Sequence, residues 1–209
     1  MTDTIPQITL ITPAEPATDT LCTRLAAALD AVPVACLRLR QSSQDPAVIA
    51  RSADLIRPLA HERDIALVID THTRLAASLG LDGVHLLDGA RSVAAARKEL
   101  GEDAIVGAFC EASTHDGMSA GERGADYVTF GPVTDQGLGS GTLAEPDLFA
   151  WWSQMIELPV VAEGGLTPDA IRALAPVTDF FAIGDEIWHA EDPARALQDL
   201  HALIREAAQ

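Results

Sequence analysis

Acidic residues in this sequence stand directly after short apolar runs. Asp70 ends the run LVID, Glu163 ends VVAE, and Asp185 follows FFAIG. Carboxylates that point toward one place raise one another's pKa, or they hold a metal ion or an organic cation. Capping of helix N-termini is the alternative role for some of these acids. The pattern indicates an acidic small-molecule site built from segments that lie far apart in the sequence.

Two arginines and a histidine lie among these acids. Arg38 and Arg40 are two residues apart in the run CLRLR, so their side chains leave an extended segment on the same side. Guanidinium groups suit a phosphate or carboxylate ligand, and an internal ion pair with the nearby acids is the alternative. His85, inside the run GVHL, is either a ligand contact or a histidine satisfied within the core.

Eight repeats of one pattern predict the frame that positions these residues. Short aliphatic or β-branched runs alternate eight times with amphipathic, Ala- and Leu-rich segments. Several runs are apolar throughout, which is typical of strands covered by helices on both faces. We therefore expect a single parallel (β/α)8 TIM-barrel domain over residues 1–209, with a doubly wound open sheet as the alternative. The predicted strands are Ile8–Thr12, Val34–Leu39, Ala66–Ile69, Gly83–Leu86, Ala104–Ala108, Tyr127–Phe130, Val160–Ala162 and Phe180–Ile183.

In such barrels the chemistry gathers on the loops that follow the strands. The longest irregular segment, Gly131–Ala144, follows the sixth predicted strand and is expected to be a mobile lid or a ligand loop.

Composition narrows the class of partner. The net charge is −17, and Lys98 is the only lysine, so nucleic acid and anionic membranes are not expected partners. Cys22, Cys36 and Cys110 form no close-spaced metal pattern, and the N-terminus does not resemble a signal peptide. We expect an acidic cytoplasmic protein that binds a small molecule, with a homo-oligomer as one option.

Six segments carry a family resemblance. ITLIT, CLRLR, LVIDTHTRLAASLGLDGVHL, GADYVTFGPV, VVAEGGLTPD and AIGDEIWHAEDPARAL resemble, in order and spacing, the thiamine phosphate synthase and thiazole tautomerase (TenI-like) family. The resemblance covers nearly the whole chain and implies a (β/α)8 barrel of thiamine biosynthesis. Synthase members of the family are transferases that join hydroxymethylpyrimidine pyrophosphate to thiazole phosphate, with Mg²⁺ assisting the departure of pyrophosphate.

The resemblance assigns roles to named positions. It implies catalytic roles for Arg38, Arg40 and Asp70. Asp70 and Asp88 are the candidates for Mg²⁺. The ligand-binding candidates are His85, Gly131, Glu163, Gly164, Gly165 and Asp185.

The chain also departs from the family pattern. Cys36 stands for the glutamine of the Gln-x-Arg-x-Lys segment and Arg40 for its lysine. Thr71 and Ala90 stand for the two metal-binding aspartates, and Asp185 stands for a serine. The segment Thr134-Asp135-Gln136-Gly137 carries no lysine where the family has one.

Three hypotheses follow. The first is that the chain is an enzyme, either a divergent synthase or a tautomerase-like isomerase. The second is that the barrel has lost the transfer chemistry and binds a neutral or cationic thiamine-related ligand or a divalent metal. The third is a partner for another thiamine-pathway protein, through the aromatic pair Trp151-Trp152. The second hypothesis requires that Glu163 and Asp185 face the cavity, because a carboxylate beside a bound phosphate opposes its binding.

Overall fold

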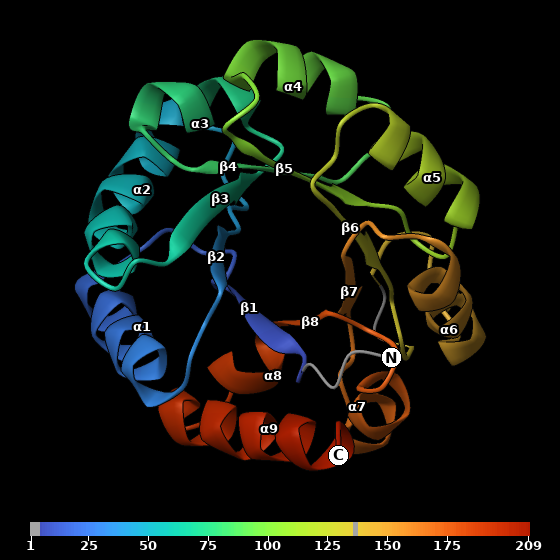
Figure 1. Cartoon of the computed structure of the whole chain (residues 1–209). Coiled ribbons are helices and arrows are strands. Elements are labelled where there is room, and N and C mark those ends of the chain that lie inside the picture. The colour runs from blue at the N-terminus through green and yellow to red at the C-terminus, as the bar shows by residue number, and fades with distance from the viewer. Residues whose placement is uncertain (1–4, 136–137) are drawn as a thin grey trace.

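Eight parallel strands close into a barrel, as predicted. The computed structural model describes residues 5–135 and 138–209. The strands follow one another around the barrel in sequence order, and β8 pairs with β1 to close it (Figure 1). The (β/α)8 prediction is confirmed, and the open sheet is excluded. The strands are β1 (Gln7–Ile11), β2 (Cys36–Leu39), β3 (Ala66–Asp70), β4 (Gly83–Leu86), β5 (Ile105–Phe109), β6 (Tyr127–Phe130), β7 (Val160–Glu163) and β8 (Phe180–Ile183).

Helices surround the barrel, and their ends follow local capping chemistry. The Thr167 side chain accepts from the backbone N–H of Ala170, and Pro168 occupies the first turn of the helix that follows β7. The helices are α1 (Asp19–Ala31), α2 (Pro46–His61), α3 (Thr73–Leu79), α4 (Val93–Leu100), α5 (Thr114–Glu122), α6 (Pro146–Met155), α7 (Pro168–Leu174), α8 (Asp185–Trp188) and α9 (Pro193–Ala207). Eight of these helices correspond to the eight amphipathic segments of the sequence; α8, a single turn directly after β8, was not predicted.

Each strand divides its side chains between two environments. On β2, Leu37 and Leu39 point outward into the main apolar core between the sheet and the helices. Cys36 and Arg38 point inward. In the interior, Ile11, Val161 and Ala182 form a small apolar cluster against which Tyr127 and Phe180 pack. Buried polar side chains, among them Arg38, His85 and Thr129, lie in the interior as well.

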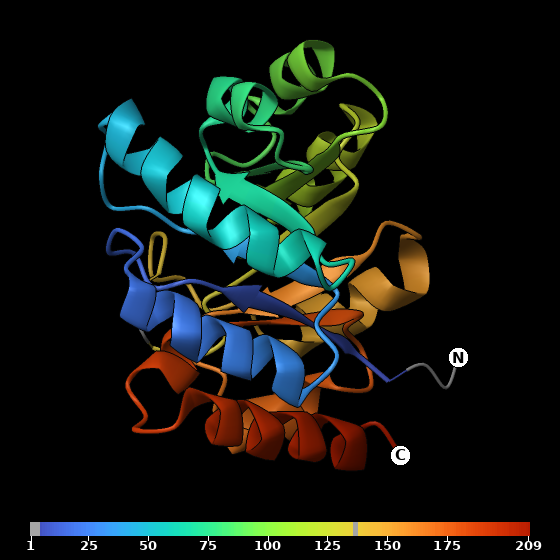
Figure 2. The ribbon, with the colours of Figure 1, turned by 90° about the vertical axis from the view of Figure 1, so that its left-hand side faces the viewer.

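The two ends of the barrel differ. The view from the side shows the C-terminus at the face where the strands begin, whereas α8 lies at the opposite face, where the strands end (Figure 2). Over residues 5–135 and 138–209, no helix is long and apolar enough to cross a membrane. In parallel barrels the chemistry gathers at the face where the strands end, so the candidate site is expected there.

Candidate functional site

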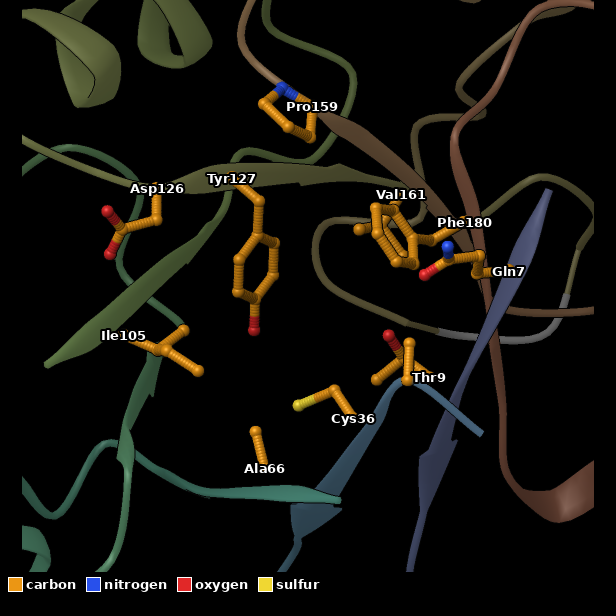
Figure 3. Close-up of a pocket in the computed structure, with 11 residues that line it drawn as sticks. Gln7, Thr9, Cys36, Ala66, Ile105, Asp126, Tyr127, Pro159, Val161 and Phe180 are labelled. Carbon is orange, nitrogen blue, oxygen red and sulfur yellow. The ribbon is translucent and has the colours of Figure 1, made fainter. Parts of the chain in front are cut away.

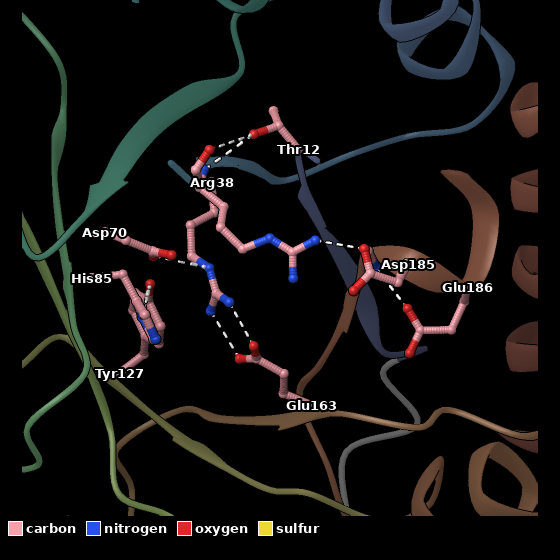
Figure 4. A network of polar contacts seen from close by, with 10 residues as sticks. Thr12, Arg38, Asp70, His85, Tyr127, Glu163, Asp185 and Glu186 are labelled. Carbon is pink, nitrogen blue, oxygen red and sulfur yellow. Dashed lines mark hydrogen bonds and ion pairs between the residues drawn. The ribbon is translucent and has the colours of Figure 1, made fainter. Parts of the chain in front are cut away.

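Arg38 is the centre of a buried charge cluster inside the barrel (Figure 4). Its Nη1 and Nη2 atoms donate to the two carboxylate oxygens of Glu163, at 2.8 and 2.5 Å. Its Nε atom lies 3.2 Å from Oδ1 of Asp70. All three side chains are at most 10% exposed. The structure contains the internal ion pair, which is one of the two interpretations that the sequence left open for this arginine.

Burial and charge together set the pKa values in this cluster. Burial alone would lower the pKa of Arg38, but the carboxylates of Glu163 and Asp70 raise it above its ordinary value. Burial raises the pKa of Asp70 to about 6; the charge of Glu163 adds to this, and Arg38 and Arg40 oppose it. The guanidinium therefore stays charged, and it faces two carboxylates.

His85 and Tyr127 form a second buried pair beside this cluster (Figure 4). The His85 Nδ1 atom lies 2.9 Å from the Tyr127 hydroxyl, and the two rings stack at 5.6 Å between centroids. The space for the tyrosine ring comes from Gly107 on the strand between them, because a Cβ atom there would lie 2.0 Å from Tyr127 Cζ. Burial, helped by the charge of Arg38, lowers the pKa of His85 well below 6.5. His85 is therefore neutral at physiological pH.

Several buried polar atoms make no hydrogen bond within the described part of the chain; Arg38 Nε and Asp70 Oδ1 are two of them, and they face each other in the ion pair. His85 Nε2 and Thr129 Oγ1 are buried, and within the described part of the chain neither has a hydrogen-bond partner. Buried polar atoms of this kind are normally satisfied by protein, water or ligand. A bound molecule or an ordered water can use His85 Nε2 and Thr129 Oγ1.

Arg40 and Asp185 form an ion pair at the rim. Arg40 Nη2 lies 2.5 Å from Asp185 Oδ1, with side chains 29% and 58% exposed. The backbone N–H of Arg40 donates to the Thr12 hydroxyl at 3.1 Å, which fixes the end of β2 against β1. A cavity of about 530 Å³ adjoins the ion pair and is lined also by Arg24 and His189. This cavity is large enough for a small organic molecule.

The short helix α8 brings a further carboxylate to the rim. Glu186 accepts from the backbone N–H of Gly184 at 2.8 Å and from that of Leu166 at 3.2 Å. The sequence placed Glu186 beside Asp185 but gave it no role. The sequence could not predict where the Glu186 side chain binds, because a one-turn helix has no periodic pattern and the partner Leu166 lies 20 residues away.

The predicted glycines shape the loops next to Glu163. A Cβ atom on Gly131 would lie 2.2 Å from the backbone oxygen of Glu163, so the loop after β6 needs glycine to pack this close to the end of β7. Gly164 and Gly165 both have positive φ, at 84° and 76°. The hydroxyl of Thr134 donates to the Gly165 oxygen at 2.8 Å and joins the two loops. Two residues of the segment Thr134–Gly137, numbers 136 and 137, lie outside the described residues.

The predicted metal ligands do not come together in a form that fits Mg²⁺. Asp70 is engaged by Arg38, while Asp88 accepts from the Ser92 hydroxyl at 2.7 Å. Among residues 5–135 and 138–209, no three His, Cys, Asp or Glu side chains are placed to hold a metal ion. Magnesium prefers several oxygen ligands in octahedral geometry, and this donor set does not supply them.

A second cavity lies at the opposite end of the barrel, where the strands begin (Figure 3). It has a volume of about 220 Å³, and Thr9, Cys36 and Tyr127 point into it among apolar side chains. Burial raises the pKa of the Cys36 thiol to about 12, which makes it a poor nucleophile. Because active sites of this barrel class lie at the other face, we place the candidate site at the rim with Arg40 and Asp185.

The fold and the rim together define a parallel (β/α)8 barrel with a candidate small-molecule site at the carboxyl ends of its strands. A family model described as thiamine monophosphate synthase matches residues 8–184. The chain therefore belongs to the thiamine monophosphate synthase family.

Relatives and solved structures agree with this assignment. A thiamine-phosphate synthase from Rhodospirillum centenum is 40% identical over 94% of this chain and 96% of its own length. A thiamine-phosphate synthase from Erythrobacter litoralis is 38% identical over 77% of this chain and 78% of its own length. The fold is similar to that of thiamine phosphate pyrophosphorylase from Pyrococcus furiosus, with a TM-score of 0.85, 21% identity and 98% coverage of both chains. The (S)-3-O-geranylgeranylglyceryl phosphate synthase from Thermoplasma acidophilum, solved with sn-glycerol-1-phosphate, also shares the fold, with a TM-score of 0.71, 18% identity, and coverage of 97% of this chain and 94% of that one.

Proposed function

We propose that this member of the family binds an uncharged or cationic thiamine-related molecule at its rim and does not turn over the pyrophosphate-displacing coupling reaction. The observation that carries the proposal is the engagement of Arg38 by Glu163 and Asp70. A guanidinium that serves a pyrophosphate must offer its N–H groups to the ligand. In this chain, carboxylates of the protein face those groups.

Electrostatics oppose the exchange of Glu163 for an anionic ligand. A pyrophosphate that took Arg38 would leave Glu163 and Asp70 uncompensated beside it. Like charges brought together in a partly dry site cost several kcal/mol. At the rim, Asp185 and Glu186 add two further negative charges. A neutral or cationic ligand does not meet this like-charge repulsion.

Calorimetric titration of the full chain with thiamine and with thiamine phosphate tests the proposal. We expect thiamine to bind more tightly, by about tenfold or more, since one unfavourable charge contact corresponds to at least about 1.4 kcal/mol. An Asp185→Asn variant should narrow the difference, and an Asp169→Asn variant, which removes an exposed charge on α7, is the matched control. Tighter binding of thiamine phosphate to the wild type would refute the proposal.

The coupling reaction is the second candidate. It is favoured by the 40% identity to a thiamine-phosphate synthase over nearly the whole chain and by the position of Arg38 inside the barrel. Mg²⁺ would have to enter with the pyrophosphate, because the donor set described above does not fit a resident ion. A steady-state assay with hydroxymethylpyrimidine pyrophosphate, thiazole phosphate and Mg²⁺ decides between the two. Product formed at a rate proportional to enzyme concentration would establish this candidate.

Two further predictions concern the setting of the protein. We infer a cytoplasmic location, because Cys22, Cys36 and Cys110 are free thiols, as is usual in a reducing compartment. A homo-oligomer stays a prediction. Trp152 is fully buried, while Trp151 is 41% exposed on α6 and is available to a partner. Sedimentation of the wild type tests the homo-oligomer; the thiamine-pathway partner that the sequence suggested for the pair Trp151-Trp152 stays a separate prediction.

A further inference from the structure

Glu186 binds two main-chain N–H groups that belong to neighbouring loops. One is Gly184, at the end of β8, and the other is Leu166, in the loop after β7; each donates to a different oxygen of the carboxylate, at 2.8 and 3.2 Å. The carboxylate is thus held as a bound oxyanion would be. In parallel barrels, the loops after the seventh and eighth strands, together with a short extra helix, frequently form a phosphate site.

The surrounding structure holds Glu186 in this place. It lies on α8, and the indole N–H of Trp188 on the same turn donates to the backbone oxygen of Ile11 at 2.6 Å. Arg24 donates to the backbone oxygen of Trp188 at 3.1 Å, and this joins α8 to α1. Both Gly184 and Leu166 are buried, so their N–H groups would lose hydrogen bonds if Glu186 moved away.

We infer that Glu186 is a specificity-determining residue whose carboxylate takes the place of a ligand phosphate and excludes that group from this side of the rim. An incoming phosphate would have to displace the carboxylate and then remain beside it, with Asp185 adjacent. Like charges in such close contact are unfavourable. The inference deepens the proposed function, on which it rests, by naming the group that the ligand lacks.

Titration with inorganic phosphate tests this inference separately from the identity of the ligand. The wild type, Glu186→Ala and Glu186→Gln would be titrated by NMR, with the backbone amide signals of Gly184 and Leu166 as the readout. We expect both variants to bind phosphate about tenfold or more tightly than the wild type, with the shifts centred on these two amides. Glu191→Ala, which removes an exposed acid just beyond α8, is the matched control and should bind phosphate no better than the wild type.

Each result decides the inference. It is overturned if the wild type binds phosphate at these amides as tightly as the variants do, if folded Glu186 variants gain no phosphate binding, or if Glu191→Ala gains as much. Glu186→Gln keeps the side-chain length and one acceptor oxygen, so it remains informative if Glu186→Ala does not fold. Failure of the proposed function would appear instead as tighter binding of thiamine phosphate to the wild type or as coupling activity.

Discussion

The Arg38–Glu163 contact should be among the strongest single interactions between charged side chains of this barrel. The guanidinium makes two hydrogen bonds to one carboxylate, and the two side chains are 4% and 7% exposed. Hydrogen bonds to charged groups contribute roughly 1.5–3 kcal/mol each, and breaking a buried pair by removing one partner costs about 3–5 kcal/mol. In Glu163→Gln, the amide keeps one acceptor oxygen. We therefore expect this variant to lose about 3 kcal/mol of unfolding free energy.

A double-mutant cycle isolates the interaction from the cost of each change. It uses Glu163→Gln, Arg38→Met and the double variant, with urea unfolding followed by tryptophan fluorescence. The double variant should be more stable than the sum of the single losses predicts, by about 2–4 kcal/mol, because neither charge is then left alone in the interior. Asp70 loses its contact with Arg38 both in Arg38→Met and in the double variant, so this loss cancels in the coupling energy.

An exposed pair of the same chemistry supplies the control. Arg172 and Asp169 are 3.0 Å apart on α7 with side chains 57% and 96% exposed. The cycle of Arg172→Met and Asp169→Asn should give a coupling energy below about 0.5 kcal/mol. The argument for a dominant buried pair is wrong if the Arg38–Glu163 coupling is no larger than this value.

Three further changes have defined outcomes. Burial raises the pKa of the folded-state Asp70 carboxyl from 3.8 to about 6, so ionisation of this group destabilises the folded wild type between pH 4 and pH 7. Asp70→Asn lacks this group. Its unfolding free energy, measured by urea unfolding, should therefore rise relative to that of the wild type by on the order of 3 kcal/mol over this range. Gly107→Ala should lower the melting temperature in calorimetry, with a loss of about 1–3 kcal/mol, because its Cβ would lie 2.0 Å from Tyr127 Cζ. Asp185→Asn should change stability by less than about 1 kcal/mol in the same assay, because its ion pair with Arg40 is exposed to solvent.

The sign of the pH effect follows from linkage. Below pH 3.8, Asp70 is protonated in both states, and above pH 6 it is ionised in both. Between these values the folded state binds the proton more tightly, so the wild type loses stability as the pH rises. A difference between Asp70→Asn and wild type that stays constant across this range would contradict the raised pKa. Likewise, an unchanged melting temperature for Gly107→Ala would mean that the Tyr127 ring can move aside freely.

The frame of this barrel could be predicted because it rests on local patterns. The strands Gly83–Leu86, Tyr127–Phe130 and Phe180–Ile183 have the bounds that the sequence predicted. The second strand was predicted from Val34 but begins at Cys36. An apolar residue before a strand resembles one inside it, so periodicity does not define this boundary. The helix α8 was missed because four residues are too few to show a helical period.

Partners across the barrel could not be predicted in the same way. The sequence placed Arg38 and Glu163 at the ends of different strands but left open whether each faced a ligand or another side chain. They are 125 residues apart, and the geometry of barrel closure decides which carboxylate meets which guanidinium. Tyr127 was missed as a partner of His85 for a related reason, since that contact depends on the absence of a side chain at Gly107 on the strand between them.

The balance of carboxylates and guanidiniums at the rim and in the barrel interior bears on the charge of the ligand that this chain can bind. Across the described rim and interior, the carboxylates of Glu15, Asp70, Glu163, Asp185 and Glu186 outnumber the guanidiniums of Arg24, Arg38 and Arg40. Glu186 binds main-chain N–H groups instead of a cation. The acids therefore exceed the bases in a region partly shielded from water, where electrostatic interactions are stronger than in bulk solvent. A ligand with a positive charge relieves this excess, whereas a phosphate increases it. Under the proposed function, the same arrangement that stabilises the arginines inside the barrel would select against the anions that arginines usually bind.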